Sequence, residues 1–274
     1  MTDVEEWQGR TGQNWAAQWR RTDRSFGPLT ERLLRRSREF RFGSALDVGC
    51  GAGELSLALA RGRPNVTVTG VDISPQLVAV ARERGSQLPN VAFEVADAAR
   101  WTPGAPLAPD LLVSRHGVMF FADPLAAFAH LAALAAPGAG LLFSCFRARG
   151  DNPFFTEVAR LLPQAAAARG HDGPGPFAFA DPARVEGILT GAGWGEIRLE
   201  AFDFAIIAGA GEDPVADAAE YFGAIGPAAR AAAELDAQER ARFMDRVREL
   251  ARRNLRDGIV SLRAATWIVT ASKS

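Results

Sequence analysis

The residues of this sequence most able to do chemistry lie in a short glycine-rich segment. Residues 46–54 read LDVGCGAGE, in which Asp47 follows an apolar run and Gly49, Gly51 and Gly53 alternate after it. Glycine adopts positive φ at little cost, so such a segment turns sharply and lets a ligand approach the backbone. A helix that follows it presents free N–H groups and a favourable field to an anionic group. The segment therefore predicts a loop that holds a small charged cofactor.

The spacing of the glycines and the scarcity of lysine argue against several cofactor classes. A dinucleotide loop of the G-x-G-x-x-G type needs glycine where this chain has Glu54. A nucleoside triphosphate loop needs lysine after its last glycine, and a pyridoxal phosphate enzyme needs an internal lysine, but the single lysine is Lys273. Tyr221 is the single tyrosine, so no tyrosine–lysine catalytic pair is available.

Two further aspartates end later strands of the predicted sheet. Asp72 lies roughly 20 residues after the glycine segment, at the end of the second strand, where an acidic side chain can accept both ribose hydroxyls. Asp97 follows the third strand. Either aspartate could instead cap the turn or helix that follows, although Ser74 already occupies the N-cap position after Asp72. Because parallel strands end at one edge of a sheet, the three acids together favour a ligand site.

The pattern D-x-G-x-G-x-G at 47–53, followed by Asp72 and Asp97, resembles the motifs of class I S-adenosylmethionine-dependent methyltransferases. The segments SRHGVMFFADP (114–124) and PFAFADP (176–182) resemble a bacterial small-molecule subgroup that is distantly like quinone-pathway methyltransferases. The resemblance covers about residues 45–146 and implies S-adenosyl-L-methionine as cofactor and S-adenosyl-L-homocysteine as product.

This resemblance implies a cofactor-binding role for each matching position. Asp47 would face the ammonium of the cofactor, directly or through water, and the glycines would approach its amino-acid end. Asp72, with Ile73 beside it, would bind the ribose. Asp97 would reach the adenine amino group, and the backbone N–H of Ala98 would meet the ring.

In the family the loop after the fourth strand runs beside the methyl group, which places Ser114, Arg115 and His116 near the chemistry. Methyl transfer depends on alignment and exclusion of water, and a base helps when the acceptor is a phenol, an enol-like carbon or an ammonium. His116 is the first candidate base and His171 the second. Arg115 either orients an acidic acceptor or forms a structural ion pair. His130 lies within a predicted helix, and we expect it to be solvated.

The N-terminal segment EEWQGRTGQNWAAQW (5–19) contains two tryptophans with two alternative roles. Trp7 and Trp15 either stack near the sulfonium, because an aromatic face attracts a cation, or anchor the segment on the core. Similar segments of relatives fold over the cofactor. We therefore expect residues 1–42 to form a helical cap or lid whose first part is weakly packed and mobile without ligand.

Strand and helix patterns alternate after this cap and predict an α/β fold, Rossmann-like and doubly wound. We expect a mostly parallel, seven-stranded sheet with right-handed crossovers. Residues 43–274 would form the methyltransferase domain, with helical acceptor-pocket insertions at about 147–180 and, before the last strand, about 205–260. The strands are expected at 45–48, 66–71, 91–95, 110–114, 140–146, 196–204 and 264–271.

The apolar residues of the second insertion predict the character of the acceptor. Phe222, Ile225, Leu235 and Phe243 suggest a small, partly hydrophobic molecule, although each of them could equally serve as packing.

Composition limits the partners of the 274-residue chain. A formal net charge of −1 lacks the excess of Lys and Arg that nucleic-acid binding requires. No apolar run approaches the roughly 18 residues of a membrane span. The two cysteines, Cys50 and Cys145, form no metal-ligand spacing, so no metal is expected. The acidic, polar first residues are unlike a secretory signal, which predicts a cytoplasmic protein, monomer or homodimer.

Because fold does not fix function, two other classes stay open. One is a cofactor-binding protein of this fold that senses a ligand or binds a partner without methyl transfer. The other is a non-methylating enzyme such as a cyclase.

Overall fold

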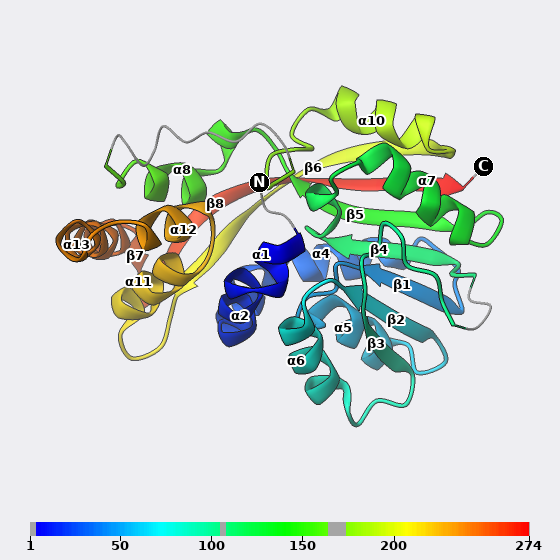
Figure 1. Cartoon of the computed structure of the whole chain (residues 1–274), viewed down its shortest axis with the longest axis horizontal. Helices are drawn as coiled ribbons and strands as arrows, with labels where there is room; N and C mark the ends of the chain where they lie inside the picture. Colours follow the sequence, from blue (N-terminus) through cyan, green and yellow to red (C-terminus); the bar gives the residue numbers. More distant parts are fainter. Residues whose placement is uncertain (1–3, 105–107, 164–173, 274) are drawn as a thin grey trace.

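The computed structural model describes residues 4–104, 108–163 and 174–273 and has the predicted α/β architecture (Figure 1). One sheet crosses the molecule in the order β3-β2-β1-β4-β5-β8-β6. Its first five strands are parallel, and β8 is antiparallel to both β5 and β6. The order reverses between β1 and β4, the place where ligands bind in doubly wound sheets. The strands of this path are β1 (Ser44–Val48), β2 (Thr67–Asp72), β3 (Val91–Val95), β4 (Leu111–Arg115), β5 (Gly140–Phe146), β6 (Trp194–Gly209) and β8 (Ile259–Lys273).

The described residues form eight strands, one more than the predicted seven. The additional strand is the two-residue β7 (Leu255–Arg256), which pairs with the start of β8. Between them Asp257 and Gly258 both have positive φ, 49° and 76°. An Asp-Gly pair with this backbone is a strong hairpin signal, so the sequence LRDGIV already contained the evidence for β7.

The helices of the parallel half begin where their capping residues predict. Ser74 Oγ accepts a hydrogen bond from the Leu77 N–H at 3.4 Å, and Asp123 accepts one from Ala126 N–H at 3.0 Å. Proline at the first helical position follows each cap, where its missing N–H costs nothing. The helices that follow the strands are α5 (Glu54–Gly62), α6 (Pro75–Gly85), α7 (Pro124–Leu134) and α10 (Pro182–Gly191).

Strands β6 and β8 are much longer than their apolar patterns suggest, with 16 and 15 residues. They run past the parallel strands and carry a second, helical lobe at the opposite end of the molecule from β3 (Figure 1). That lobe contains α8 (Pro153–Ala159), α11 (Pro214–Ala224), α12 (Pro227–Ala233) and α13 (Ala237–Arg253). The helical insertion before the last strand is therefore present, and both of its ends continue as strand.

Among the residues described from Val4 on, four short helices precede β1 and lie between the two lobes (Figure 1). They are α1 (Val4–Gln8), α2 (Arg10–Ala17), α3 (Trp19–Ser25) and α4 (Gly27–Ser37). Phe26, Leu29 and Leu33 from this region belong to one hydrophobic core that also contains β5 and the helices of the second lobe. The N-terminal helices therefore close the gap between the sheet and the helical lobe, which is where the site lies.

Candidate functional site

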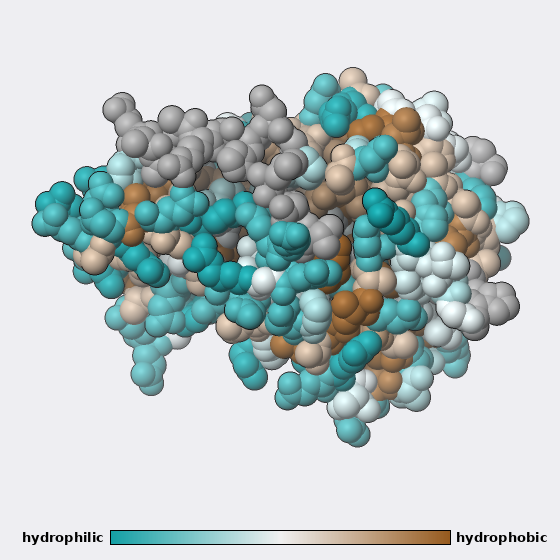
Figure 2. Space-filling model, in the orientation of Figure 1, coloured by the Kyte–Doolittle hydropathy of each residue, from teal (hydrophilic) through white to brown (hydrophobic). Residues whose placement is uncertain are grey.

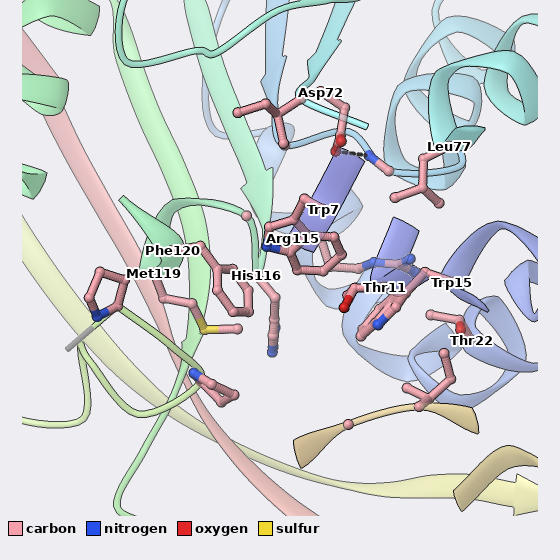
Figure 3. A pocket seen from close by; sticks show the side chains of 18 of the residues that line it. Trp7, Thr11, Trp15, Thr22, Asp72, Leu77, Arg115, His116, Met119 and Phe120 are labelled. Carbon is pink, nitrogen blue, oxygen red and sulfur yellow. Dashed lines mark hydrogen bonds between the residues drawn. The ribbon is translucent and has the colours of Figure 1, made fainter. Parts of the chain in front are cut away.

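A cavity of about 610 Å³ lies at the carboxyl ends of β1, β2 and β4, under the N-terminal helices. Hydrophobic residues gather near the middle of the molecular face in Figure 2, whereas the surface over α13 is mostly hydrophilic. Figure 3 shows the cavity from close by, with Trp7, Thr11 and Trp15 on the side of the N-terminal helices and Asp72 and Leu77 facing them. Most of the predicted cofactor-binding residues line it: Trp7, Trp15, Asp47, Gly49, Gly51, Asp72, Ile73, Asp97 and Ala98.

The glycine segment has the backbone that only glycine adopts readily. Gly49, Gly51 and Gly53 have φ of 68°, 55° and 87°. A Cβ on Gly49 would lie 2.8 Å from the Cα of Gly117, so the loop after β4 packs directly on the glycine segment. A Cβ on Gly51 would meet nothing within 4 Å, because this residue borders the cavity. The segment is therefore both tightly packed against the fold and open toward a ligand.

Asp72 connects this glycine segment to the end of β2. Its Oδ2 accepts a hydrogen bond from Gly51 N–H at 2.8 Å, drawn as the dashed line in Figure 3, and its Oδ1 accepts one from Ser74 N–H at 2.9 Å. Burial raises the pKa of Asp72, while the hydrogen bonds from Ser74 and Gly51 oppose that rise. The carboxylate thus shapes the site as well as lining it, a structural role that the sequence analysis did not anticipate.

Asp47 has a buried carboxyl group, of which one oxygen accepts a hydrogen bond from a described residue and the other does not. Its side chain is 1% exposed, and Oδ2 accepts a hydrogen bond from Ser56 Oγ at 2.6 Å. Oδ1 has no hydrogen-bond partner among the described residues. Burial raises the pKa of Asp47 to about 6, against the Ser56 hydrogen bond. A buried acceptor that lines a cavity in this way requires a donor from a ligand or water.

Asp97 and its neighbours form the far wall of this half of the cavity. Asp97 Oδ1 accepts a hydrogen bond from Ala99 N–H at 3.0 Å, so the aspartate does stabilise the turn after β3. Ile73, Asp97 and Ala98 all line the cavity as well. The turn-capping and ligand-facing alternatives are therefore compatible at this position.

Two predicted cofactor residues lie behind the cavity wall. Ser114 Oγ donates to Val48 C=O at 2.6 Å and accepts from Gly117 N–H at 3.1 Å, which joins the ends of β1 and β4. Gly53 is the N-cap of α5, and a Cβ there would lie 3.0 Å from Ala81 and from Phe93. Neither residue is part of the cavity lining. The Ser114 side chain and the Gly53 backbone instead position the loops that line the cavity.

Arg115 is committed to an ion pair with the N-terminal cap. Its guanidinium donates to Thr30 Oγ1 at 2.7 Å and lies 3.2 Å from Asp23 Oδ1. Asp23 also lies 2.9 Å from Arg84, which in turn pairs with Glu54 at 2.8 Å. Of the two alternatives for Arg115, the structure contains the ion pair. This network fastens α3 to the loop after β4 and to the helices beside the glycine segment.

His116 lines the cavity from an unusual backbone conformation, φ 67°. Its ring lies edge-on to Phe146, with centroids 4.0 Å apart, and 5.4 Å from Phe26. Nδ1 lies 3.4 Å from Ser144 Oγ, and Nε2 is buried without a hydrogen-bond partner among the described residues. Burial lowers the pKa of His116 to about 3, and the charge of Arg115 acts in the same direction. The imidazole is therefore neutral at physiological pH.

The other two histidines take no part in this arrangement. His130 Nε2 lies 2.7 Å from the Trp101 carbonyl oxygen, so the expectation of a solvated side chain is wrong. The ring joins α7 to the turn after β3. His171 lies outside the described residues.

The N-terminal helices contact the glycine segment through aromatic side chains. Trp7 lies edge-on to Trp15 and to Phe120, with ring centroids 5.6 and 5.3 Å apart. Trp7, Trp15 and Trp19 surround a small cluster that contains Ala52 of the glycine segment and Leu77 of α6. The tryptophans both anchor the cap and line the cavity, so the two alternatives are not exclusive. The segment is also better packed than its composition suggested.

Gly12 allows α2 to approach the start of α6 closely. A Cβ at Gly12 would lie 2.1 Å from the Trp7 carbonyl oxygen and 2.3 Å from Ser74 Oγ. The Gln76 side chain adds a hydrogen bond to the Gln8 carbonyl oxygen at 3.0 Å. Helix α2 therefore rests directly on the N-terminus of α6, beside Asp72.

The second half of the cavity is an aromatic chamber, walled by β5, α8 and α11. Phe222 and Ile225 line it as predicted, whereas Leu235 and Phe243 lie outside the lining and serve as packing. Several other residues line the cavity although nothing in their local sequence predicts it: Phe26, Phe146, Phe154, Phe155 and Tyr221.

Within the described ranges, no cluster of three or more His, Cys, Asp or Glu has metal-binding geometry. No helix among the described residues is long and apolar enough to cross a membrane. Cys50 and Cys145 are buried and unpaired.

Comparison with known proteins agrees with this geometry. Residues 45–138 match the family described as a methyltransferase domain. Trans-aconitate 2-methyltransferase of Methylobacterium radiotolerans is 37% identical over 139 residues, which cover 51% of this chain and 48% of that protein. Malonyl-[acyl-carrier protein] O-methyltransferase of a Paenibacillus species is 31% identical over 112 residues, 40% of either protein. The chain thus matches less than half the length of these curated relatives.

Solved structures share the fold. Phosphoethanolamine N-methyltransferase 2 of Haemonchus contortus, solved with S-adenosyl-L-methionine, has a TM-score of 0.58 and 17% identity, and the match covers 100% of this chain and 60% of that one. At this identity the likeness shows the fold alone. The predicted Rossmann-like fold is confirmed, and residues 45–138 of it match a methyltransferase domain.

Proposed function

We propose that this chain, a class I methyltransferase by its family match over residues 45–138 and by its fold, transfers a methyl group from S-adenosyl-L-methionine to a small, partly hydrophobic acceptor. The observation that carries the proposal is the meeting of Asp47, Gly51, Asp72 and Asp97 around one cavity at the switch point of the sheet. When bound, the cofactor supplies a methyl group on a sulfonium whose C–S bond breaks onto sulfur.

The residues present fit this cofactor. The unpartnered Asp47 Oδ1 is a buried acceptor suited to the ammonium, which would supply the donor that it lacks. The open face of Gly51 and the N-terminus of α5 suit the carboxylate. Asp72 retains lone pairs for the ribose hydroxyls, because each of its oxygens accepts one backbone N–H. Ile73, Asp97 and Ala98 would hold the adenine.

The chain's own residues contribute alignment and exclusion of water. The tryptophans of the cap cover the glycine segment, and the Asp23–Arg115 ion pair holds the cap against the loop after β4. Such closure places two reactants in one geometry and removes competing water, which are the main requirements of an in-line displacement. Arg115 acts as a positioning residue in this arrangement.

We propose that the methyl acceptor binds in the aromatic chamber. The named substrates of the matched relatives, trans-aconitate and malonyl-[acyl-carrier protein], do not transfer directly, because the family match ends at residue 138, before the helices that wall the chamber. Phe222 and Ile225 support the expectation of a partly hydrophobic molecule.

Indirect observations support our proposals on partners and cellular location. A net charge of −1 supports a small-molecule acceptor and no nucleic-acid partner. The two unpaired cysteines support a cytoplasmic location. We expect a monomer or homodimer.

Calorimetry of the whole chain with S-adenosyl-L-methionine, S-adenosyl-L-homocysteine and NAD tests the proposal. We expect saturable binding of the first two and none of NAD. Incubation with methyl-labelled cofactor and a panel of phenolic, quinonoid and amine acceptors should then yield labelled product. Saturable NAD binding without binding of S-adenosyl-L-methionine would overturn the proposed function.

A further inference from the structure

We infer that the acceptor is an uncharged aromatic alcohol, a ring-bearing hydroxyl compound of the phenol class, with its hydroxyl at His116 Nε2. This inference rests on the proposed function and names the substrate class of the same cavity. It differs from what the matched relatives' names would suggest, since trans-aconitate carries carboxylates and no ring.

The walls of the chamber are suited to a flat ring. Phe146, at the end of β5, lies edge-on to Phe155 with centroids 5.0 Å apart and tilted to Phe154 at 5.6 Å. Phe26 closes the side next to the cap, and Phe222 the side of α11. Aromatic walls that meet at such angles gain from edge-to-face and offset contacts with another ring, in addition to the burial of apolar area. A small anion without a ring would gain neither.

The cationic groups of the cavity are already compensated or lie at its exposed rim. Arg115 pairs with Asp23, and Arg230 pairs with Glu6 at 3.0 Å. Arg149 is exposed and lies over the Phe177 ring, 4.8 Å from its centroid. Burying a carboxylate costs several kcal/mol unless a cation and hydrogen bonds compensate it. A polycarboxylate acceptor would therefore find no uncommitted deep cation among the described lining residues.

His116, which lines the chamber, carries a buried polar atom without a partner in the described part of the chain. His116 Nε2 is buried without a hydrogen bond in the described part of the chain, and its ring lies against Phe146 and Phe26. When the ring proton is on Nδ1, toward Ser144 Oγ, Nε2 carries a lone pair that no described residue uses. A neutral hydroxyl would satisfy this atom, whereas a carboxylate would repel it.

The transfer step balances with this assignment. The acceptor oxygen uses a lone pair to form the O–CH3 bond as the C–S bond breaks onto sulfur, and its O–H proton passes to Nε2. A methylated, still protonated oxygen is a much stronger acid than an imidazolium. Even a histidine with a pKa of about 3 can therefore take that proton and later release it to water.

The experiment uses the full chain with 2-naphthol and trans-aconitate as probes. Binding of each probe to protein saturated with S-adenosyl-L-homocysteine is measured by calorimetry, and methyl-labelled product is then identified by mass spectrometry. We expect 2-naphthol to bind and to yield its methyl ether, and trans-aconitate to do neither. Methylation of trans-aconitate without binding of 2-naphthol would overturn the inference and leave the proposed function intact. Absence of cofactor binding would instead overturn the proposed function, and this inference with it.

Two variants and one control test which residues bind the probe and take the proton. Phe155→Ala should weaken 2-naphthol binding about tenfold with S-adenosyl-L-homocysteine affinity unchanged, whereas Phe202→Ala, which removes a half-buried ring outside the cavity, should change neither. His116→Asn suits the left-handed backbone and should lower kcat by about 100-fold or more with little change in cofactor affinity. An unchanged kcat in a folded His116→Asn variant would remove His116 from the assignment.

Discussion

The Oδ2 atom of Asp72 lies 2.8 Å from the backbone nitrogen of Gly51, so the end of β2 holds the turn that follows β1. The two residues are 21 positions apart in the sequence, and the hydrogen bond joins the two motifs that the chain uses to bind its proposed cofactor. The carboxylate proposed to bind the ribose thus also supports the loop beside it. This dual role changes what a substitution at Asp72 should do.

Asp72→Ala should therefore weaken both cofactor binding and the fold. Loss of a charged partner for buried hydroxyls costs about 1–3 kcal/mol of binding free energy, and the N–H groups of Gly51 and Ser74 lose their acceptor. Calorimetry with S-adenosyl-L-homocysteine and thermal unfolding measure the two effects.

A matched control exists at the opposite end of β1. Asp110 Oδ2 accepts hydrogen bonds from Gly43 N–H at 2.9 Å and Ser44 N–H at 3.0 Å, away from the cavity. Asp110→Ala should lower the Tm and leave cofactor affinity unchanged. Equal cofactor affinity in Asp72→Ala and Asp110→Ala would remove Asp72 from the site.

Asp47→Asn should stabilise the ligand-free protein at neutral pH while weakening cofactor binding. Burial raises the folded-state pKa of Asp47 to about 6, above its unfolded value, so the folded state binds the extra proton and loses that stabilisation as pH rises through 6. The amide of the Asp47→Asn variant does not ionise, so the variant keeps its stability as pH rises. Its free energy of unfolding at pH 8 should exceed that of the wild type by on the order of 2 kcal/mol.

Urea unfolding at pH 5 and pH 8 tests the sign. The difference between Asp47→Asn and wild type should shrink at pH 5, where Asp47 is already largely protonated. Asp245→Asn, at a side chain that is 77% exposed, serves as the control and should show no such pH dependence. A variant that is less stable than wild type at pH 8 contradicts the argument.

Gly12→Ala should displace the N-terminal helices from the glycine segment. The added methyl group would lie 2.1 Å from the Trp7 carbonyl oxygen and 2.3 Å from Ser74 Oγ, so α2 has to move away from α6. We expect faster hydrogen exchange over residues 4–17 and weaker binding of S-adenosyl-L-homocysteine. Gly27→Ala, where a Cβ meets nothing within 4 Å, should leave both unchanged.

The same exchange measurement on wild-type protein tests the lid. If the N-terminal helices close over the cofactor, S-adenosyl-L-homocysteine should slow exchange over residues 4–17. Equal protection with and without ligand would mean that the tryptophans are fixed anchors of the core.

Gly117→Ala should damage the site for a purely steric reason. Gly117 has an ordinary negative φ, but a Cβ there would lie 2.5 Å from the Val48 carbonyl oxygen and 2.9 Å from the Gly49 Cα. We expect a lower Tm and weaker cofactor binding. Gly187→Ala, in the exposed interior of α10 with open space around it, should instead raise stability by about 0.5–1 kcal/mol. A Tm that Gly117→Ala does not lower would show that the two loops are less closely packed than the structure indicates.

The cofactor half of the site could be predicted because its requirements are local. Positive φ at Gly49, Gly51 and Gly53 demands glycine at those positions, and an acidic residue at a strand end is visible once the strand is recognised. The boundaries of β1 to β5 followed from apolar runs and capping residues in the same way. Ser114 was predicted to bind the cofactor, but it does not line the cavity. The direction of a side chain at a strand end depends on the neighbouring strand that it contacts.

The acceptor half could be located only in part. The insertion before the last strand predicted that Phe222 and Ile225 line the chamber and also suggested Leu235 and Phe243, which do not. All four are apolar residues on helices, and their local sequence does not tell which face of a helix turns toward the cavity.

The sequence by itself determined the fold class, the glycine turn and the acids at the strand ends, since each depends on backbone conformation or on contacts between near neighbours. The tertiary structure alone decided that Arg115 pairs with Asp23, 92 residues away. It also decided that Phe26 and Phe146 pack against His116 and that Phe155 packs against Phe146. Those contacts depend on how helices and strands from distant parts of the chain cross one another. Crossing geometry arises from the packing of whole surfaces, and no short stretch of sequence specifies it.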